Sequence, residues 1–147
     1  MKKAVSWLLC AVWMSVIFIM SAMPGDVSGE QSGMIVRWIL RAAEQIFGTS
    51  EMLCAETLAL IVRKAAHMGE YAVLWLLYAR ALAVSGAERP RLTALFLSVF
   101  YAATDEFHQG FIAGRGPSAM DVCIDALGAA AAWGTSALAE KTRKKEH

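Results

Sequence analysis

The chain has 147 residues, of which 57% are hydrophobic and 18% are charged. A soluble domain usually carries about 45–50% apolar and about 25% charged residues, so both values favour a membrane protein over a soluble one. The length is that of one small domain. The formal net charge of +1 gives no signal for nucleic acid or another polyanion as a partner.

Residues 4–23 form an almost uninterrupted apolar run behind Lys2 and Lys3. A signal peptide has a similar start, but this run has roughly the 20 residues that a spanning helix needs. The residues before Pro24 also make a poor small-x-small cleavage site. We therefore predict that this segment is the first transmembrane helix and that Pro24 and Gly25 end it.

The next segment, at about residues 34–47, has the pattern of an amphipathic helix. Ile35, Trp38 and Ile39 recur at helical spacing, with charged residues such as Arg41 on the opposite face. The segment is too short and too charged to cross a bilayer. We therefore predict a short helix that lies in the membrane interface.

Three further spans are predicted at about residues 65–84, 92–110 and 119–139. The helical pattern of the second span begins near Glu51 and exceeds the roughly 30 Å hydrocarbon core, so its first part is expected to protrude, tilt or break. The predicted fold is therefore all-α. It is an integral membrane bundle of four transmembrane helices plus the short interfacial amphipathic helix, in one domain over residues 1–147.

The basic residues predict the orientation of these four spans. With both termini in the cytoplasm, nine of the 14 lysines and arginines lie inside and five lie outside. The five outside residues count for less where they fall in the long loop before the second span. We therefore predict a multi-pass protein with a cytoplasmic N-terminus and a cytoplasmic C-terminus.

Ten ionisable residues lie in or beside the predicted spans, although each costs roughly 2.5–3.5 kcal/mol at mid-helix on insertion scales. They are Arg63, Lys64, His67, Glu70, Asp105, Glu106, His108, Arg115, Asp121 and Asp125. In the four-span topology, the start of the second span, the end of the third and the start of the fourth are all extracytoplasmic. We therefore predict one polar pocket at the extracytoplasmic interface that collects these groups.

Helical spacing supports a shared pocket. Arg63, His67 and Glu70 fall on one face of one helix, and Asp121 and Asp125 fall on one face of another. A charged stripe that faced lipid would be costly, so each stripe is expected to face the interior of the bundle.

Glycines complete the predicted pocket. Gly69 and Gly128 would allow helices to approach closely. The run Gly114 to Pro117 predicts a tight turn that would hold Arg115 over the mouth of the pocket.

The charges of this cluster do not balance. Five carboxylates face three lysine or arginine side chains, which leaves an excess of two negative charges when both histidines are neutral. A low-dielectric pocket would remove the excess by raising carboxyl pKa values, by protonating the histidines or by binding a cation. The first case supplies a general acid at neutral pH. A purely structural salt-bridge network is a weaker alternative, because such networks rarely repay their desolvation cost.

A divalent metal is an open alternative for the bound cation. His67 and Glu70 are spaced to share one cation on a helix face, and Asp105 or His108 would complete its coordination. The pattern is not a strong zinc signature such as His-Glu-x-x-His, so we assign no metal ligands from it.

Five stretches of the chain together resemble the VanZ-like family of small bacterial membrane proteins. They are Ile17–Ser21, Arg63–Tyr71, Asp105–Gln109, Gly114-Arg115 and Asp121–Gly128. Each is weak alone, but their order and spacing are specific. The resemblance implies a location in the bacterial cytoplasmic membrane. The family's named member is associated with low-level resistance to teicoplanin, a lipid-tailed glycopeptide that acts on the outer face of the membrane.

The resemblance implies no settled biochemical activity, but it indicates which residues of this chain are candidates for the functional site. With the helical spacing it gives the predicted catalytic residues, His67, Glu70, Asp105, Glu106, Gln109 and Asp125. It also gives the predicted substrate-binding residues, Lys64, Tyr71, Arg115 and Asp121. Asp125 lies where the family pattern also leads us to expect Asn, which favours hydrogen bonding over charge as its role.

Three functions fit this pattern. The first is an enzyme, a hydrolase or transferase, acting on an outer-leaflet lipid or a lipid-linked envelope precursor. In it, Lys64 and Arg115 would hold a phosphate or other anionic head group, and carboxyl groups would act as acid and base. The second is a non-enzymatic binder of lipoglycopeptide or anionic lipid. The third, a small transporter, is disfavoured because a pathway needs polar groups through the midplane. The sequence does not indicate an oligomeric state.

Overall fold

The computed structural model describes residues 2–24, 27, 30, 33–41 and 55–143 of the chain. Its four long helices are α1 (Lys2–Ser21), α3 (Ala55–Ser85), α4 (Pro90–Gln109) and α5 (Ala119–Arg143). Residues 33–41 are also helical. The described residues contain no strand, so the all-α prediction is confirmed for them.

Each predicted span coincides largely with one long helix, although α3 begins at Ala55, ten residues before the predicted start of the second span. α4 begins at Pro90, where the missing N–H of proline is tolerated in the first helical turn. α5 continues to Arg143, beyond the predicted end of the fourth span at about residue 139. The predicted interfacial helix is helical at residues 33–41, and its remaining part lies outside the described residues.

α3 is the centre of the bundle. It contacts α1, α4 and α5, whereas α1 and α5 do not contact each other within the described part of the chain. Aromatic side chains add hydrogen bonds between the helices. Trp13 Nε1 of α1 donates to the carbonyl oxygen of Glu70 in α3 at 2.9 Å, and Tyr101 Oη of α4 donates to the carbonyl oxygen of Met14 in α1 at 2.7 Å.

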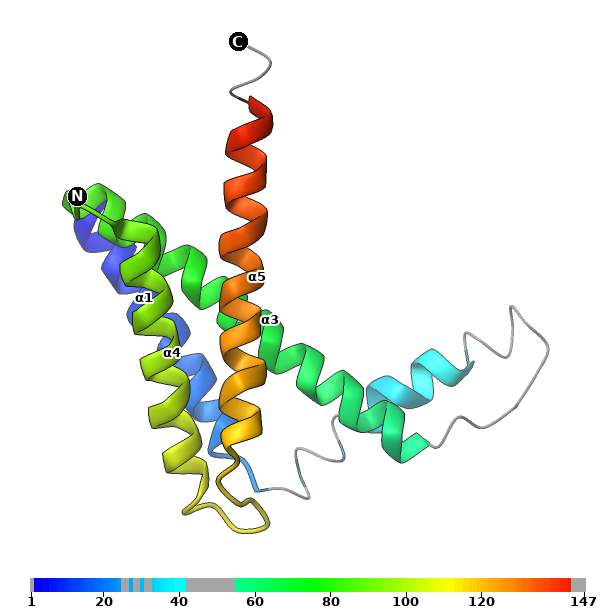
Figure 1. The fold of residues 1–147 in the computed structure, drawn as a ribbon. Coiled ribbons are helices and arrows are strands. Elements are labelled where there is room, and N and C mark those ends of the chain that lie inside the picture. The colour runs from blue at the N-terminus through cyan, green and yellow to red at the C-terminus, as the bar shows by residue number, and fades with distance from the viewer. Residues whose placement is uncertain (1, 25–26, 28–29, 31–32, 42–54, 144–147) are drawn as a thin grey trace.

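The polar residues of the sequence come together at one end of this bundle. Figure 1 shows the C-terminal ends of α1 and α4 and the N-terminal end of α5 at the same end of the molecule, with α3 running diagonally across the bundle. The connection from α4 to α5 is a tight turn in which Gly114 has a φ of 73°. A side chain at this position would be strained, so glycine allows the turn to present Arg115.

α3 and α5 approach each other closely at Gly128. A Cβ atom at this position would overlap the carbonyl oxygen of Met68 and would lie 2.8 Å from the Met68 Cα atom. Both contacts are with backbone, which cannot move aside as a side chain can. The close approach expected of Gly128 is therefore confirmed, whereas Gly69 has no such neighbour within 4 Å.

We expect Gly128→Ala to separate α3 from α5 and to lower the melting temperature of the detergent-solubilised protein, because overpacking typically costs about 1–3 kcal/mol. Gly134→Ala in the same helix is the matched control, since nothing lies within 4 Å of its added methyl group. Alanine has the higher helix propensity, so the control should be neutral or slightly stabilising. Equal melting temperatures for the two variants would contradict the close crossing.

α4 exposes large aromatic side chains and buries small or polar ones. Its exposed face carries Phe96, Phe100 and Phe107, each at least 67% exposed. Its buried residues are small or polar: Ala94, Ser98, Ala102, Asp105, Glu106 and Gln109. In water this distribution would be reversed, because large aromatic side chains are normally buried and carboxylates are normally exposed. Small and polar residues at the interface are typical of helices that pack within a membrane.

Two helices in the described part of the chain are long and apolar enough to cross a membrane by length and composition alone. They are α1 and residues Ala119–Thr142 of α5. The four-span bundle is therefore not confirmed by this criterion and stays a prediction. α3 and α4 carry much of the ionisable cluster, which lowers their overall hydropathy although α4 keeps an apolar outer face.

Candidate functional site

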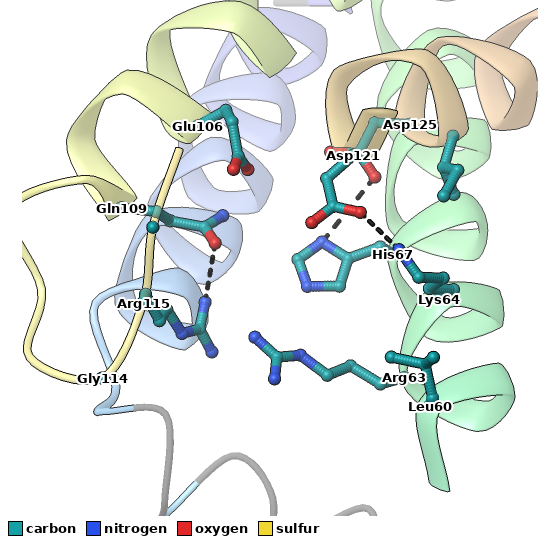
Figure 2. A pocket seen from close by; sticks show the side chains of 12 residues that line it. Leu60, Arg63, Lys64, His67, Glu106, Gln109, Gly114, Arg115, Asp121 and Asp125 are labelled. Atoms are coloured by element: carbon teal, nitrogen blue, oxygen red, sulfur yellow. Dashed lines mark hydrogen bonds and ion pairs between the residues drawn. The ribbon is translucent and has the colours of Figure 1, made fainter. Parts of the chain in front are cut away.

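A cavity of about 220 Å³ lies at the polar end of the bundle, between α3, α4, the α4–α5 turn and α5. Figure 2 shows the side chains around it. Its lining residues are Leu60, Arg63, Lys64, His67, Glu106, Gln109, Gly114, Arg115, Gly116, Asp121, Ile124 and Asp125. Seven of the ten site residues that the sequence predicts are among them, so the structure does bring residues from three distant segments into one pocket.

Asp105 is the buried acceptor behind one wall of the cavity. Ser21 Oγ donates to its Oδ1 atom at 2.6 Å, and Gln109 Nε2 donates to its Oδ2 atom at 3.0 Å. Arg115 Nη1 in turn donates to Gln109 Oε1 at 2.9 Å and to the carbonyl oxygen of Ser21 at 3.1 Å. These bonds tie the end of α1, the end of α4 and the turn into one network.

The guanidinium group of Arg115 is only partly satisfied by this network. Its Nε atom is buried and has no hydrogen-bond partner among the described residues. Burial lowers the pKa of Arg115, and the neighbouring Arg63 guanidinium lowers it further. Figure 2 shows the two guanidinium groups facing each other across the cavity, one from the α4–α5 turn and one from α3.

Lys64 and Asp121 form an ion pair on the other side of the cavity. Lys64 Nζ lies 2.5 Å from Asp121 Oδ1, and the two side chains are 35% and 44% exposed. This contact joins α3 to the first turn of α5 and neutralises the charge of Lys64. The pair is too exposed to add much to stability, since such pairs contribute about 0–1 kcal/mol.

Glu106 closes the cavity on the α4 side and also binds the start of α5. The backbone N–H of Ser118 donates to Glu106 Oε1 at 2.7 Å, just before the first residue of α5. A carboxylate at a helix N-terminus is favoured by the helix dipole and by the unpaired N–H groups there. Glu106 is therefore held in place by its first oxygen, and its side chain lies on the cavity wall that faces His67 (Figure 2).

His67 has carboxylates beside one of its two ring nitrogens. Its Nδ1 atom lies 3.7 Å from Asp125 Oδ1 and 4.0 Å from Glu70 Oε2. The Asp125 side chain is 3% exposed, so this carboxylate is held inside the protein. In Figure 2 the other ring nitrogen, Nε2, is turned toward the side of the cavity where the two guanidinium groups lie. Both separations are longer than a hydrogen bond, so the two carboxylates lie beside the ring without bonding to it. A carboxylate on the far side of the ring from the reacting group is also found beside catalytic histidines.

Three of the predicted site residues do not line the cavity. Glu70 stands behind His67, and Asp105 stands behind Gln109. Tyr71 is completely buried, its hydroxyl has no partner among the described residues, and its ring packs against Tyr101 at a centroid distance of 6.4 Å. From these positions the three residues can hold the cavity residues in place but cannot contact a molecule bound in the cavity.

Two residues matter more in the structure than the sequence indicates. Arg63 belongs to the ionisable cluster but is not among the predicted catalytic or substrate-binding residues, and it lines the cavity. Ser21 lies in the first resembling stretch and supplies the donor to Asp105, although a serine near a helix end usually signals only turn chemistry. His108 packs against Phe18 at a ring distance of 4.4 Å and is not part of the lining.

The structure gives no added support to a metal centre. Within the described residues, no group of three or more His, Cys, Asp or Glu side chains is arranged to hold a metal ion. The negative surplus counted from the sequence is also absent from the lining itself. The lining carries three carboxylates, Glu106, Asp121 and Asp125, and three positively charged side chains, Arg63, Lys64 and Arg115.

Comparison with known proteins supports the resemblance seen in the sequence. No curated protein and no solved structure matches the chain. The model of the VanZ/LLP1 family, however, matches residues 6–140, which is nearly the whole chain and includes every residue of the cavity. The chain belongs to the VanZ/LLP1 family.

Proposed function

We propose that this protein is an integral membrane hydrolase or transferase that acts on an outer-leaflet lipid or a lipid-linked envelope precursor. The observation that carries the proposal is the placement of His67, which has carboxylates at Nδ1 and the cavity at Nε2. Such a histidine is a candidate base or nucleophile. The cavity also offers cationic side chains to hold an anionic head group.

The membrane part of the proposal is a four-span bundle with both termini in the cytoplasm. Besides α1 and α5, the exposed phenylalanines and buried carboxylates of α4 support a lipid environment for that helix. α3 lies between α1, α4 and α5 and would then be the central span. This topology puts the cavity at the extracytoplasmic end, level with the head groups of the outer leaflet.

In the proposed hydrolysis, His67 Nε2 takes a proton from a water molecule while the water oxygen bonds to the reacting atom of the substrate. The bond from that atom to the leaving oxygen breaks, and the protonated imidazole of His67 gives the proton it took from water to that oxygen. Asp125 and Glu70 lie on the Nδ1 side of the ring, where ionised carboxylates would attract its protonated form. In group transfer, an acceptor hydroxyl takes the place of the water.

The size of the cavity favours a lipid head group over a whole antibiotic. Its volume of about 220 Å³ is below the roughly 300–1,000 Å³ of pockets that enclose drug-sized ligands. A lipoglycopeptide is larger still. A link to glycopeptide resistance, which the resemblance implies, would therefore run through a change in envelope lipids, and a non-enzymatic binder would hold an anionic lipid.

The proposal predicts lipid turnover that depends on His67. The full chain is reconstituted in vesicles made from a bacterial lipid extract, and all lipid species are followed by mass spectrometry. We expect one species to be consumed by the wild type and at least about 100-fold more slowly by His67→Gln, because general acid–base catalysis contributes about 10²–10⁴-fold. His108→Gln is the matched control, since His108 lies outside the cavity lining.

The same assay separates the enzyme from the binder. If the wild type and His67→Gln consume the lipid equally, His67 is not catalytic and the mechanism is wrong. If the wild type consumes no lipid species, the enzyme proposal fails and binding of an anionic lipid becomes the better account.

A further inference from the structure

We infer that the anionic group held in the cavity is a phosphate monoester, bound between the guanidinium groups of Arg63 and Arg115. The inference deepens the proposed function, and it rests on that function only for the claim that the phosphate belongs to a lipid. It also gives Arg63 a binding role and reduces the role that the sequence suggests for Lys64.

Arg63 and Arg115 have no carboxylate partner of their own. Within the described residues, neither guanidinium group is within ion-pair distance of a carboxylate, although the lining carries as many carboxylates as lysine and arginine side chains. The two guanidinium groups nevertheless face each other across the cavity (Figure 2). Two like charges in a partly buried space repel each other. An anion bound between them would attract both guanidinium groups and so offset that repulsion.

Lys64, the third cation of the cavity, already has a carboxylate partner. Its ammonium group lies 2.5 Å from Asp121 Oδ1, so its charge is already matched by a carboxylate from the same cavity. A ligand that recruited Lys64 would have to break this contact. Arg63 has no ion pair in the described part of the chain, so a ligand can bind it without breaking one.

The shape of the two guanidinium groups also fits a phosphate. A guanidinium group presents a planar fork of N–H donors that fits two oxygens of a carboxylate or phosphate. One fork is enough for the two oxygens of a carboxylate. Two forks on opposite sides suit a tetrahedral group whose oxygens point in several directions, and two positive charges match a phosphate monoester, which carries a charge of about −1.5 to −2 at pH 7.

One further donor lies beside the same group. The buried Nε atom of Arg115 has no partner among the described residues. His67 Nε2, the base of the proposed function, is turned toward the two guanidinium groups (Figure 2). A buried donor without an acceptor costs about 1–3 kcal/mol, so a ligand oxygen near Arg115 would recover part of that cost. The phosphate would then lie next to the proposed catalytic histidine.

The test is thermal unfolding of the full chain in detergent with two probes. One arm adds inorganic phosphate against sodium chloride at equal ionic strength. The other adds phosphatidic acid to the micelles against phosphatidylcholine. A ligand that binds only the folded state raises its stability, so the melting temperature should rise and saturate. A rise in both arms shows that phosphate alone suffices, and a rise with phosphatidic acid only shows that the lipid is also needed.

Variants show which side chains the rise in melting temperature depends on. Arg63→Gln and Arg115→Gln should each abolish the rise, and Arg63→Lys should keep only part of it, because a lysine lacks the planar fork. Lys64→Gln should keep the rise. The matched control is Arg80→Gln, which removes the same charge from the exposed surface of the same helix. The melting temperature of each variant without ligand checks that it is folded.

No rise in either arm would overturn the inference, and so would a rise that Lys64→Gln abolishes and Arg63→Gln retains. These outcomes are distinct from failure of the proposed function. Lipid consumption by a protein that phosphate and phosphatidic acid do not stabilise would overturn only the phosphate inference. Stabilisation that requires Arg63, in a protein that consumes no lipid, would support the phosphate site and overturn the enzyme.

Discussion

Replacing Asp105 with alanine is expected to destabilise the protein by about 3 kcal/mol and to loosen the turn that carries Arg115. Asp105 is 3% exposed, and its two carboxylate oxygens accept hydrogen bonds from Ser21 and Gln109. Alanine leaves these donors without their acceptor, and each unsatisfied buried group costs about 1–3 kcal/mol. The effect should also reach Arg115, because Gln109 is one of its two acceptors.

Chemical unfolding in detergent measures the first effect, and the rate of tryptic cleavage after Arg115 measures the second. Asp121→Ala is the matched control, because it removes the same side chain from an exposed ion pair worth about 0–1 kcal/mol. Asp105→Asn should remain folded, since the amide keeps one acceptor and the shape of the side chain. Equal unfolding free energies for Asp105→Ala and Asp121→Ala would contradict the network.

The sequence predicted most of the fold because the helices have strong local signals. Apolar runs, Pro90 at a helix start and the glycine-rich turn before α5 each mark a boundary without reference to the rest of the chain. The membrane-spanning role of α3 and α4 is less clear from the sequence. α3 and α4 mix apolar residues with ionisable ones, and composition cannot show which of them face outward. The exposed Phe100 and the buried Asp105 of α4 become informative only when the packing is known.

The clustering of the ionisable residues could be predicted because helical spacing puts such residues on defined faces. Spacing cannot show which residue on a face reaches the cavity, since that depends on how neighbouring helices cross. Glu70 and His67 share a face, yet only His67 lines the cavity. Spacing also cannot pair residues between helices. The Lys64–Asp121 contact, which leaves Arg63 as the cation available to a ligand, joins residues 57 positions apart.

The central claim is that the cavity opens on the extracytoplasmic side of a four-span bundle, and single-cysteine labelling tests it most directly. Cys10, Cys54 and Cys123 are first replaced with alanine. Gly116→Cys then places a thiol in the exposed α4–α5 turn, where nothing lies within 4 Å of the added atom. Glu88→Cys places one in the exposed turn between α3 and α4, at the opposite end of the bundle.

Both variants are expressed in bacteria, and intact spheroplasts are treated with a membrane-impermeant maleimide. We predict that Gly116→Cys is labelled at once, whereas Glu88→Cys is labelled only after the membrane is permeabilised. The difference should be close to all-or-none, because the reagent does not cross a bilayer. Labelling of Glu88→Cys alone, or of both variants in intact spheroplasts, would contradict an extracytoplasmic cavity in a four-span bundle.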